Sequence, residues 1–364
     1  ASPLVSGALG TGKLSVLVAF AAIPWTLHTL RRSVGVETAD PRTAHMDVAD
    51  GLVSLSWPER LRRTMQFALV VALGTAFEPT VLVMSATVGV LMAAATLLAL
   101  APWKTAVRYL GVTVVGVLVA GLLNLPWITS WRWDAIAGPP PIGDAGRGVR
   151  ALASFEIGPT DFVSLALALY VPVVAALFLA RAWRLTWAVR AGVLVVGFGA
   201  LAVFGDQDRL PFTPPEAGLL LVPVAVGLAI SAGAALAAFD LDVRGGSFGW
   251  RQPLGLAASV AVAVGVVPGA LAVAAGDWNA PDTPLSRLIE ARLPAVPEDG
   301  PGDYHVLLVG DARLLPLPAA EYRDGVSFAV MSDDDLEIAD RWAPTDRSDA
   351  TIVSALDQIA NGST

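Results

Sequence analysis

Few residues in this chain combine a reactive side chain with an informative position, and Glu78 is the first of them. It lies inside an apolar stretch that runs from residue 67 to residue 101. A carboxylate in such a stretch is costly to desolvate and often has a function. Pro79 follows it and is expected to break the helix, so that freed backbone groups could line a cavity. Glu78 is therefore our candidate catalytic carboxylate, and the alternative is a fully hydrated side chain at the membrane interface.

A second group of candidates consists of four consecutive residues, Trp131, Arg132, Trp133 and Asp134. Indole rings stack on sugar rings, and an arginine guanidinium binds a phosphate through two parallel hydrogen bonds. This pattern favours a substrate-binding site for a sugar or a lipid phosphate, or else an aromatic belt. His28, near the end of an apolar run, is a further candidate for substrate binding, the alternative being an imidazole hydrogen-bonded to the backbone.

Several kinds of chemistry are excluded by residue usage. The chain has no Cys, and its three His residues are far apart in sequence, so we predict no metal site. Residues 7–14 approach the Walker A pattern, but Leu14 stands where a Ser or Thr would bind magnesium. Neither a Ser–His–Asp order nor a motif of paired carboxylates occurs. We therefore predict no cofactor.

Composition defines the class of protein that must position these residues. The chain has 364 residues, of which 55% are hydrophobic and 15% charged, and its mean hydropathy is +0.62. Soluble domains average about 25% charged residues, so the chain is predicted to be a polytopic membrane protein. Residues 277–364 carry six arginines against 17 Asp and Glu. This acidic composition argues against a nucleic-acid partner and divides the chain into a membrane region, 1–276, and an acidic soluble tail, 277–364.

The apolar runs predict a mainly α-helical transmembrane bundle with about seven spans. The stretch 67–101 is too long for one span and too short for two, so we divide it at Glu78–Pro79. Ser56 and Glu59 fit a capping box at the start of a helix over 57–77, which we expect to lie at the interface or to enter the membrane part-way. The predicted spans are 14–30, 79–101, 105–128, 160–181, 184–204, 217–239 and 254–275.

Basic residues in short loops orient the bundle. Lys104, Arg181 and Arg244 fall on one side, which is predicted to be cytoplasmic. With these spans the arginines between residues 31 and 63 fall on the opposite side, which disagrees with the predicted orientation. The tail is then extracytoplasmic, and we expect it to form a small α/β domain with strands over 304–310 and 326–331 and a helix over 350–360. We expect this tail to be truncated and the chain to be a segment of a longer polypeptide.

Three segments carry a family resemblance: the break at 76–79, the loop Phe239–Gln252, and the strand followed by Gly-Asp-Ala-Arg-Leu-Leu-Pro-Leu-Pro at 304–318. In these features the chain resembles the C-terminal multi-span region of large actinobacterial membrane glycosyltransferases. These are similar to GT-C enzymes, and a family-2 glycosyltransferase domain can precede the region. The resemblance implies a polyprenyl-phosphate sugar donor and hexosyl or pentosyl transfer at the outer face. No catalytic residue carries over, so we expect the catalytic motif to lie upstream.

The expected function is therefore that of the membrane region of a cell-envelope glycosyltransferase in a bacterial plasma membrane. Its partners would be the lipid bilayer and a polyprenyl-phosphate-linked sugar or glycan. Two alternatives stay open. One is a transporter or flippase of a lipid-linked saccharide, favoured by broken helices and by an intramembrane Glu. The other is a membrane scaffold without chemistry.

Overall fold

The structure, a computed structural model, divides into two compact units, residues 1–280 and residues 281–364. Each unit is described by itself. The residues that the structure describes are 3–10, 13–36, 55–129, 148–155, 163–181, 183–207, 209–244, 249–274, 304–310 and 326–332.

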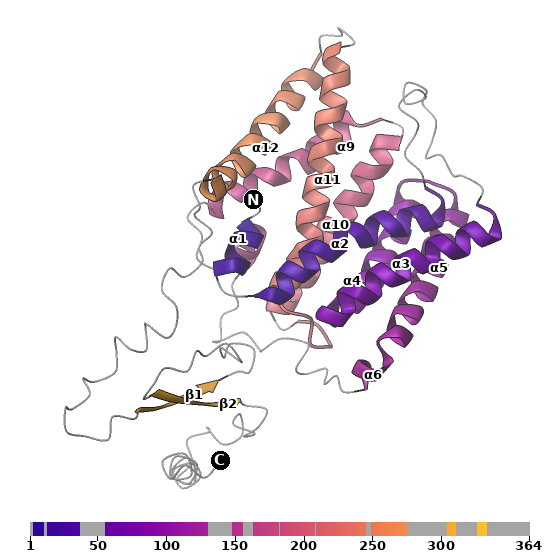
Figure 1. Cartoon of the computed structure of the whole chain (residues 1–364). Coiled ribbons are helices and arrows are strands. Elements are labelled where there is room, and N and C mark those ends of the chain that lie inside the picture. The colour runs from indigo at the N-terminus through magenta and orange to yellow at the C-terminus, as the bar shows by residue number, and fades with distance from the viewer. Residues whose placement is uncertain are drawn as a thin grey trace. The chain divides into compact units, whose positions relative to one another are not determined.

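The first unit is a helical bundle (Figure 1). Long helices run through it, with shorter ones at the connections. Its described elements are α1 Pro3–Gly10, α2 Leu14–Val34, α3 Trp57–Phe77, α4 Thr80–Leu98, α5 Trp103–Leu123, α6 Leu125–Ile128, α8 Gly148–Ala153, the 3₁₀-helix η1 Val163–Tyr170, α9 Val171–Leu179, α10 Trp183–Asp206, α11 Ala217–Arg244 and α12 Arg251–Ala274.

Six described helices are long and apolar enough to cross a membrane. They confirm the prediction of a mainly helical, multi-pass membrane protein. These helices comprise Leu14–Val34, Thr80–Leu98, Trp103–Leu123, Trp183–Asp206, Ala217–Asp240 and Arg251–Leu271.

The span predicted over 160–181 has a different local structure. It consists of the eight-residue η1 followed by the nine-residue α9, and its apolar helical part, Leu165–Leu179, is shorter than the six. Pro172 lies in the first turn of α9, where its missing N–H removes no hydrogen bond of that helix. Because a 3₁₀-helix rises about 2.0 Å per residue and an α-helix about 1.5 Å, the two pieces together cover about 30 Å. A seventh crossing at this segment stays a prediction.

The predicted break between α3 and α4 is present. α3 ends at Phe77, Glu78 has an extended backbone, and α4 begins at Thr80. Proline disfavours the helical conformation of the residue before it, which explains the break at Glu78–Pro79. The predicted capping box is wrong. Ser56 is the N-cap residue of α3, but its side chain makes no capping hydrogen bond. The Glu59 carboxylate instead pairs with two arginines one turn further along.

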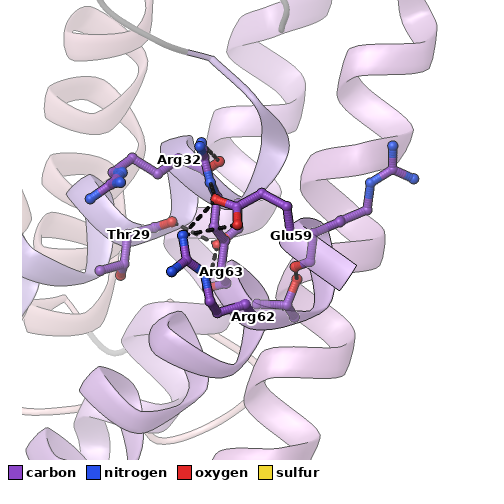
Figure 2. A network of polar contacts seen from close by, with 8 residues as sticks. Thr29, Arg32, Glu59, Arg62 and Arg63 are labelled. Carbon is purple, nitrogen blue, oxygen red and sulfur yellow. Dashed lines mark hydrogen bonds and ion pairs between the residues drawn. The ribbon is translucent and has the colours of Figure 1, made fainter. Parts of the chain in front are cut away.

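A polar network joins the end of α2 to the start of α3 (Figure 2). Glu59 accepts a hydrogen bond from Arg63 Nε at 2.6 Å and one from Arg62 at 3.0 Å. Arg63 donates to the backbone carbonyl of Arg32 at 3.1 Å, which also accepts a hydrogen bond from the backbone N–H of the C-cap residue Gly35. The Ser33 hydroxyl donates to the Arg63 carbonyl at 2.7 Å. The carboxylate thus fixes Arg63 against the end of α2.

Glycines allow the long helices to approach closely, as in other membrane bundles. A Cβ atom at Gly89 of α4 would collide with the Thr113 side chain of α5. A Cβ atom at Gly227 of α11 would lie 2.8 Å from Val195 Cγ2 and 2.9 Å from the Ala191 carbonyl oxygen of α10. α10 and α11 therefore pack backbone against backbone, and together they form one wall of the groove described below.

The second unit contains two described strands, β1 Tyr304–Gly310 and β2 Val326–Ser332. They pair in parallel, with Tyr304 opposite Val326 and Gly310 opposite Ser332. The helix predicted over 350–360 lies outside the described residues. An α/β domain in the tail stays a prediction.

Candidate basic-aromatic groove

A partly open groove of about 390 Å³ lies between α2, α10 and α11. This volume is within the range of about 300–1,000 Å³ that is typical of small-molecule sites. The lining is mostly apolar, with two arginines, one histidine and two tryptophans. Its residues are Pro24, Leu27, His28 and Arg31 from α2, Trp183, Arg184 and Trp187 from α10, and Val226, Ile230, Gly233, Ala234 and Ala237 from α11.

Helical periodicity explains why these residues meet. On α2 the successive lining residues are three, one and three positions apart, which places them on one face of the helix. On α11 they recur at intervals of four, three, one and three, again along one face. The groove therefore needs no irregular backbone within these helices, and α2 continues as a helix through Pro24.

Cations and aromatic rings alternate from the groove into the interior of the bundle. The Arg31 guanidinium carbon lies 5.8 Å from the centroid of the Trp187 ring. The Arg190 guanidinium carbon lies 5.0 Å from the same ring and 5.7 Å from the centroid of Tyr109 on α5. Arg190 is only 1% exposed. Since an aromatic face attracts a cation most strongly where water is excluded, this series fixes α2 and α5 against α10.

Arg184 provides a second cation at the groove. Its guanidinium carbon lies 5.1 Å from the centroid of Trp183. Its Nε atom is buried and makes no hydrogen bond within the described part of the chain. A buried donor without an acceptor costs about 1–3 kcal/mol. Arg184 also lines the groove, where its guanidinium could meet an anionic ligand.

Small residues on α11 keep the groove open. A Cβ atom built at Gly233 would meet no atom within 4 Å, whereas the one at Gly227, further into the bundle, collides with α10. Ala234 and Ala237 extend the same small face. Leu27, Val226 and Ile230 add larger apolar side chains to the lining.

This combination of groups fits an amphipathic anion. Two guanidiniums can hold phosphate oxygens, the tryptophan faces can pack against a sugar ring or an acyl chain, and the leucine, valine and isoleucine side chains can contact a hydrocarbon. His28 is the lining residue whose type exchanges protons near neutral pH. Its ring lies edge-on to Trp25, with 6.1 Å between the ring centroids.

The structure places the sequence-predicted site residues in three different situations. His28 lines the groove. Trp131, Arg132, Trp133 and Asp134 lie outside the described residues, so their predicted binding role stays a prediction.

Glu78 lies in the turn between α3 and α4 and is not among the groove residues. Its Oε1 accepts hydrogen bonds from the Thr80 hydroxyl at 2.7 Å and from the Thr80 backbone N–H at 3.2 Å. This is a local cap on the first turn of α4, which gives the carboxylate a structural use. A Cβ atom at Gly74, one turn earlier, would lie 2.9 Å from Val81 Cγ1 and 3.0 Å from Ala22 Cβ, so the helices beside the break are closely packed. A catalytic role for Glu78 stays a prediction.

Sequence reasoning missed Arg31, Arg184 and Trp187 as site residues. Each lies near the end of an apolar run, where arginine and tryptophan are expected in any membrane helix. Their convergence depends on which helices are neighbours. One signal in the sequence could have identified Arg31: Pro24, His28 and Arg31 are spaced so that they lie on one face of a helix. No cluster of three or more metal-binding side chains occurs among the described residues.

Comparisons of the chain with protein-family models, with curated proteins and with solved structures find no match.

Proposed function

We propose that this chain binds a polyprenyl-phosphate-linked sugar or glycan through its phosphate, as the membrane region of a cell-envelope glycosyltransferase. The observation that carries the proposal is a groove lined by Arg31, Arg184 and two tryptophans, in which the Arg184 Nε has no hydrogen-bond acceptor among the described residues. The groove is partly open and lies between helices that can cross a membrane, so a lipid could enter it from the bilayer.

A phosphate is favoured over a carboxylate because two separate guanidiniums face the groove. A phosphate group presents several oxygens in a tetrahedral arrangement, and each arginine can engage a different pair. The apolar residues of the lining favour a ligand with a hydrocarbon part over a free sugar phosphate. Glycosyl transfer from such a ligand breaks the bond between the sugar and the phosphate and moves the acceptor's proton to a base. His28 is the residue of the groove suited to receive it.

The alternative function, transport of a lipid-linked saccharide, has one specific observation in its favour. The groove is lined by Arg184, three residues after Arg181, on the side that the loop charges predict to be cytoplasmic. Resemblance to the glycosyltransferases implies transfer at the outer face. A ligand taken up at the cytoplasmic side would have to move to the other side.

The decisive test is binding of defined probes to the chain in nanodiscs of neutral lipid. Polyprenyl phosphate is expected to bind, whereas polyprenol, which lacks the charge, and inorganic phosphate, which lacks the chain, are expected to bind weakly or not at all. Arg184→Gln should weaken polyprenyl phosphate binding by about 10- to 150-fold, the value of a charge-assisted hydrogen bond. Lys104→Gln is the matched control, because Lys104 is an exposed cation outside the groove.

Equal loss in Arg184→Gln and Lys104→Gln would contradict the proposal, since binding would then follow net charge. Equal affinity for polyprenol would also contradict it. Transfer of the sugar to an added glycan acceptor in membranes favours the enzyme. Movement of a lipid-linked saccharide between the leaflets of proteoliposomes, without transfer, favours transport.

A further inference from the structure

We infer that α3 crosses the whole membrane and that the bundle therefore gathers its basic residues at one end, where they face the anionic headgroups of the cytoplasmic leaflet. The partner of this surface is the lipid bilayer. The inference is independent of the ligand proposed for the groove, because it rests on the packing of α3 and on the charges at its start.

α3 runs antiparallel to α2 along its length. Ser33, near the end of α2, bonds to the carbonyl of Arg63, near the start of α3. The position of Gly74, near the end of α3, lies against Ala22 in the middle of α2. Figure 1 shows the two helices side by side. A helix lying flat at the membrane surface would cross α2 instead of following it.

α3 also runs parallel to α5. The Phe67 ring fills the space that a Cβ atom at Gly116 would occupy. Further along both helices, the Asn124 amide that follows α5 donates to the Ala72 carbonyl at 3.1 Å. α5 is one of the six helices that are long and apolar enough to cross a membrane; α3 has the same length, 21 residues, but its charged start keeps it out of that set. At about 1.5 Å per residue, α3 is about 31 Å long, and its uncharged part, Thr64–Phe77, is about 21 Å, so the charged first turns would lie at the level of the lipid headgroups.

The surface of α3 fits this depth. Beyond its first two turns its exposed side chains are apolar apart from Gln66, and Leu69, Leu73 and Phe77 are exposed by 60%, 66% and 72%. Soluble surfaces rarely carry such a row of large apolar groups, and lipid chains would cover it. The charges of α3 are confined to Glu59–Arg63 at its start. An interfacial helix would instead carry a polar face along its whole length.

A crossing by α3 changes the side on which the early arginines lie. With α3 at the interface, the arginines of 31–63 lie opposite Lys104 and disagree with the loop charges. With α3 across the membrane, α4 returns to the level of the α2–α3 connection, and Lys104 lies at that level too. The Arg31–Trp187 contact places the start of α10 at the same end.

The remaining helices follow from contacts already described. The second half of α11, as far as Ala237, lines the groove that Arg31 also lines, and Arg251 of α12 donates to the carbonyl of Leu179 at the end of α9. The described basic residues at this end are Arg31, Arg32, Arg60, Arg62, Arg63, Lys104, Arg108, Arg181, Arg184, Arg244 and Arg251.

Among the residues that the structure describes, fewer basic ones lie at the opposite end. Lys13 pairs with Glu216 at the start of α11. Arg150 is on α8, whose first N–H donates to Asp206 at the end of α10, and Arg209 follows that helix. Membrane proteins carry an excess of Lys and Arg on the cytoplasmic side, and this bundle shows the same asymmetry. With α3 across the membrane, the arginines between residues 31 and 63 also agree with it.

Single cysteines test the inference in intact cells, because the chain has no Cys of its own. Ser56→Cys reports the start of α3, and its hydroxyl makes no capping bond that the substitution would remove. Lys104→Cys reports the α4–α5 connection and Thr213→Cys the α10–α11 connection. All three positions are exposed. A membrane-impermeant maleimide should label Thr213→Cys in intact cells, and should label Ser56→Cys and Lys104→Cys only after permeabilisation.

Labelling of Ser56→Cys together with Thr213→Cys in intact cells would overturn the crossing by α3. A Ser56→Cys that stays unlabelled after permeabilisation would also count against it, since the structure exposes this position. Labelling of Ser56→Cys and Lys104→Cys with protection of Thr213→Cys would overturn the assignment of the basic end to the cytoplasmic leaflet.

Discussion

The guanidinium of Arg31 lies over the ring of Trp187, 5.8 Å from its centroid, and joins the last turns of α2 to the first turns of α10. The two residues are far apart in sequence and border the same groove. A cation–π contact of this kind is worth about 0.5–2 kcal/mol, depending on how much water it excludes. Trp187 also contacts Arg190, so it couples the groove to the buried centre of the bundle.

A double-mutant cycle should reveal this coupling. Arg31→Gln and Trp187→Leu each remove one partner, and the combined variant should be more stable than the sum of the two losses predicts, by about 0.5–2 kcal/mol. The measurement is thermal unfolding of the detergent-solubilised chain. The control cycle combines Arg31→Gln with Phe212→Leu, an exposed residue in the α10–α11 connection, and should be additive. Additivity in both cycles would show that the Trp187 contact contributes nothing.

Filling the groove should block it without unfolding the protein. Gly233→Leu adds a side chain where a Cβ atom meets no neighbour within 4 Å. We expect polyprenyl phosphate binding to fall at least tenfold while thermal stability stays close to that of the unmodified chain. Gly111→Leu is the matched control, because Gly111 is also helical and unobstructed but lies on α5 away from the groove. Equal binding by the two variants would place the ligand elsewhere.

Gly227→Ala, unlike Gly233→Leu, should lower the thermal stability of the bundle. Its methyl group would lie 2.8 Å from Val195 Cγ2 and 2.9 Å from a backbone oxygen of Ala191, which cannot move without displacing α10. Overpacking of this kind costs about 1–3 kcal/mol. Gly111→Ala, where space is open, should instead stabilise its helix by about 0.5–1 kcal/mol. Thermal unfolding of the two variants under the same conditions provides the comparison, and a neutral Gly227→Ala would contradict the close packing of α10 on α11.

Substitutions at Glu78 can distinguish a helix-capping role of its carboxylate from a catalytic role. If the carboxylate acts as the cap on α4, Glu78→Ala should cost about 0.5–2 kcal/mol of stability, and Glu78→Gln, which keeps an oxygen acceptor for Thr80, should cost less. If the carboxylate accepts a proton in catalysis, Glu78→Gln should reduce turnover while leaving stability unchanged. Glycan transfer in membranes at matched protein level, measured beside thermal unfolding, decides between the two.

The side of the acidic tail can be tested with Ser327→Cys. If the chain leaves α12 at the end opposite the basic residues, the tail is extracytoplasmic, and this cysteine should react with an impermeant maleimide in intact cells. Ser247→Cys, in the α11–α12 connection, should be protected until the cells are permeabilised. The reverse result would place the tail in the cytoplasm.

The amino-acid sequence by itself determined the class of protein and most of its helices. Long apolar runs define membrane helices because a bilayer offers no partners for exposed backbone groups, so hydrophobic length alone predicts them. Pro79 marked the end of α3 for an equally local reason, since proline restricts the backbone of the residue before it. His28 was predicted as a site residue from its position near the end of such a run; the structure places it in the groove lining, and its role stays a prediction.

Only the tertiary structure decided which helix ends meet. The Arg31–Trp187 contact and the groove exist because α2 lies beside the α10–α11 pair. The sequence of an apolar helix has no periodic pattern from which its neighbouring helices could be predicted. Glycines such as Gly227 allow two helices to pack closely only where the surfaces of both helices are complementary in shape, so the pairing depends on both sequences together. The direction of α3 is decided in the same way. The charges at its start argued against a membrane-crossing helix in the sequence, and its packing along α2 and α5 is the observation from which we infer that it crosses.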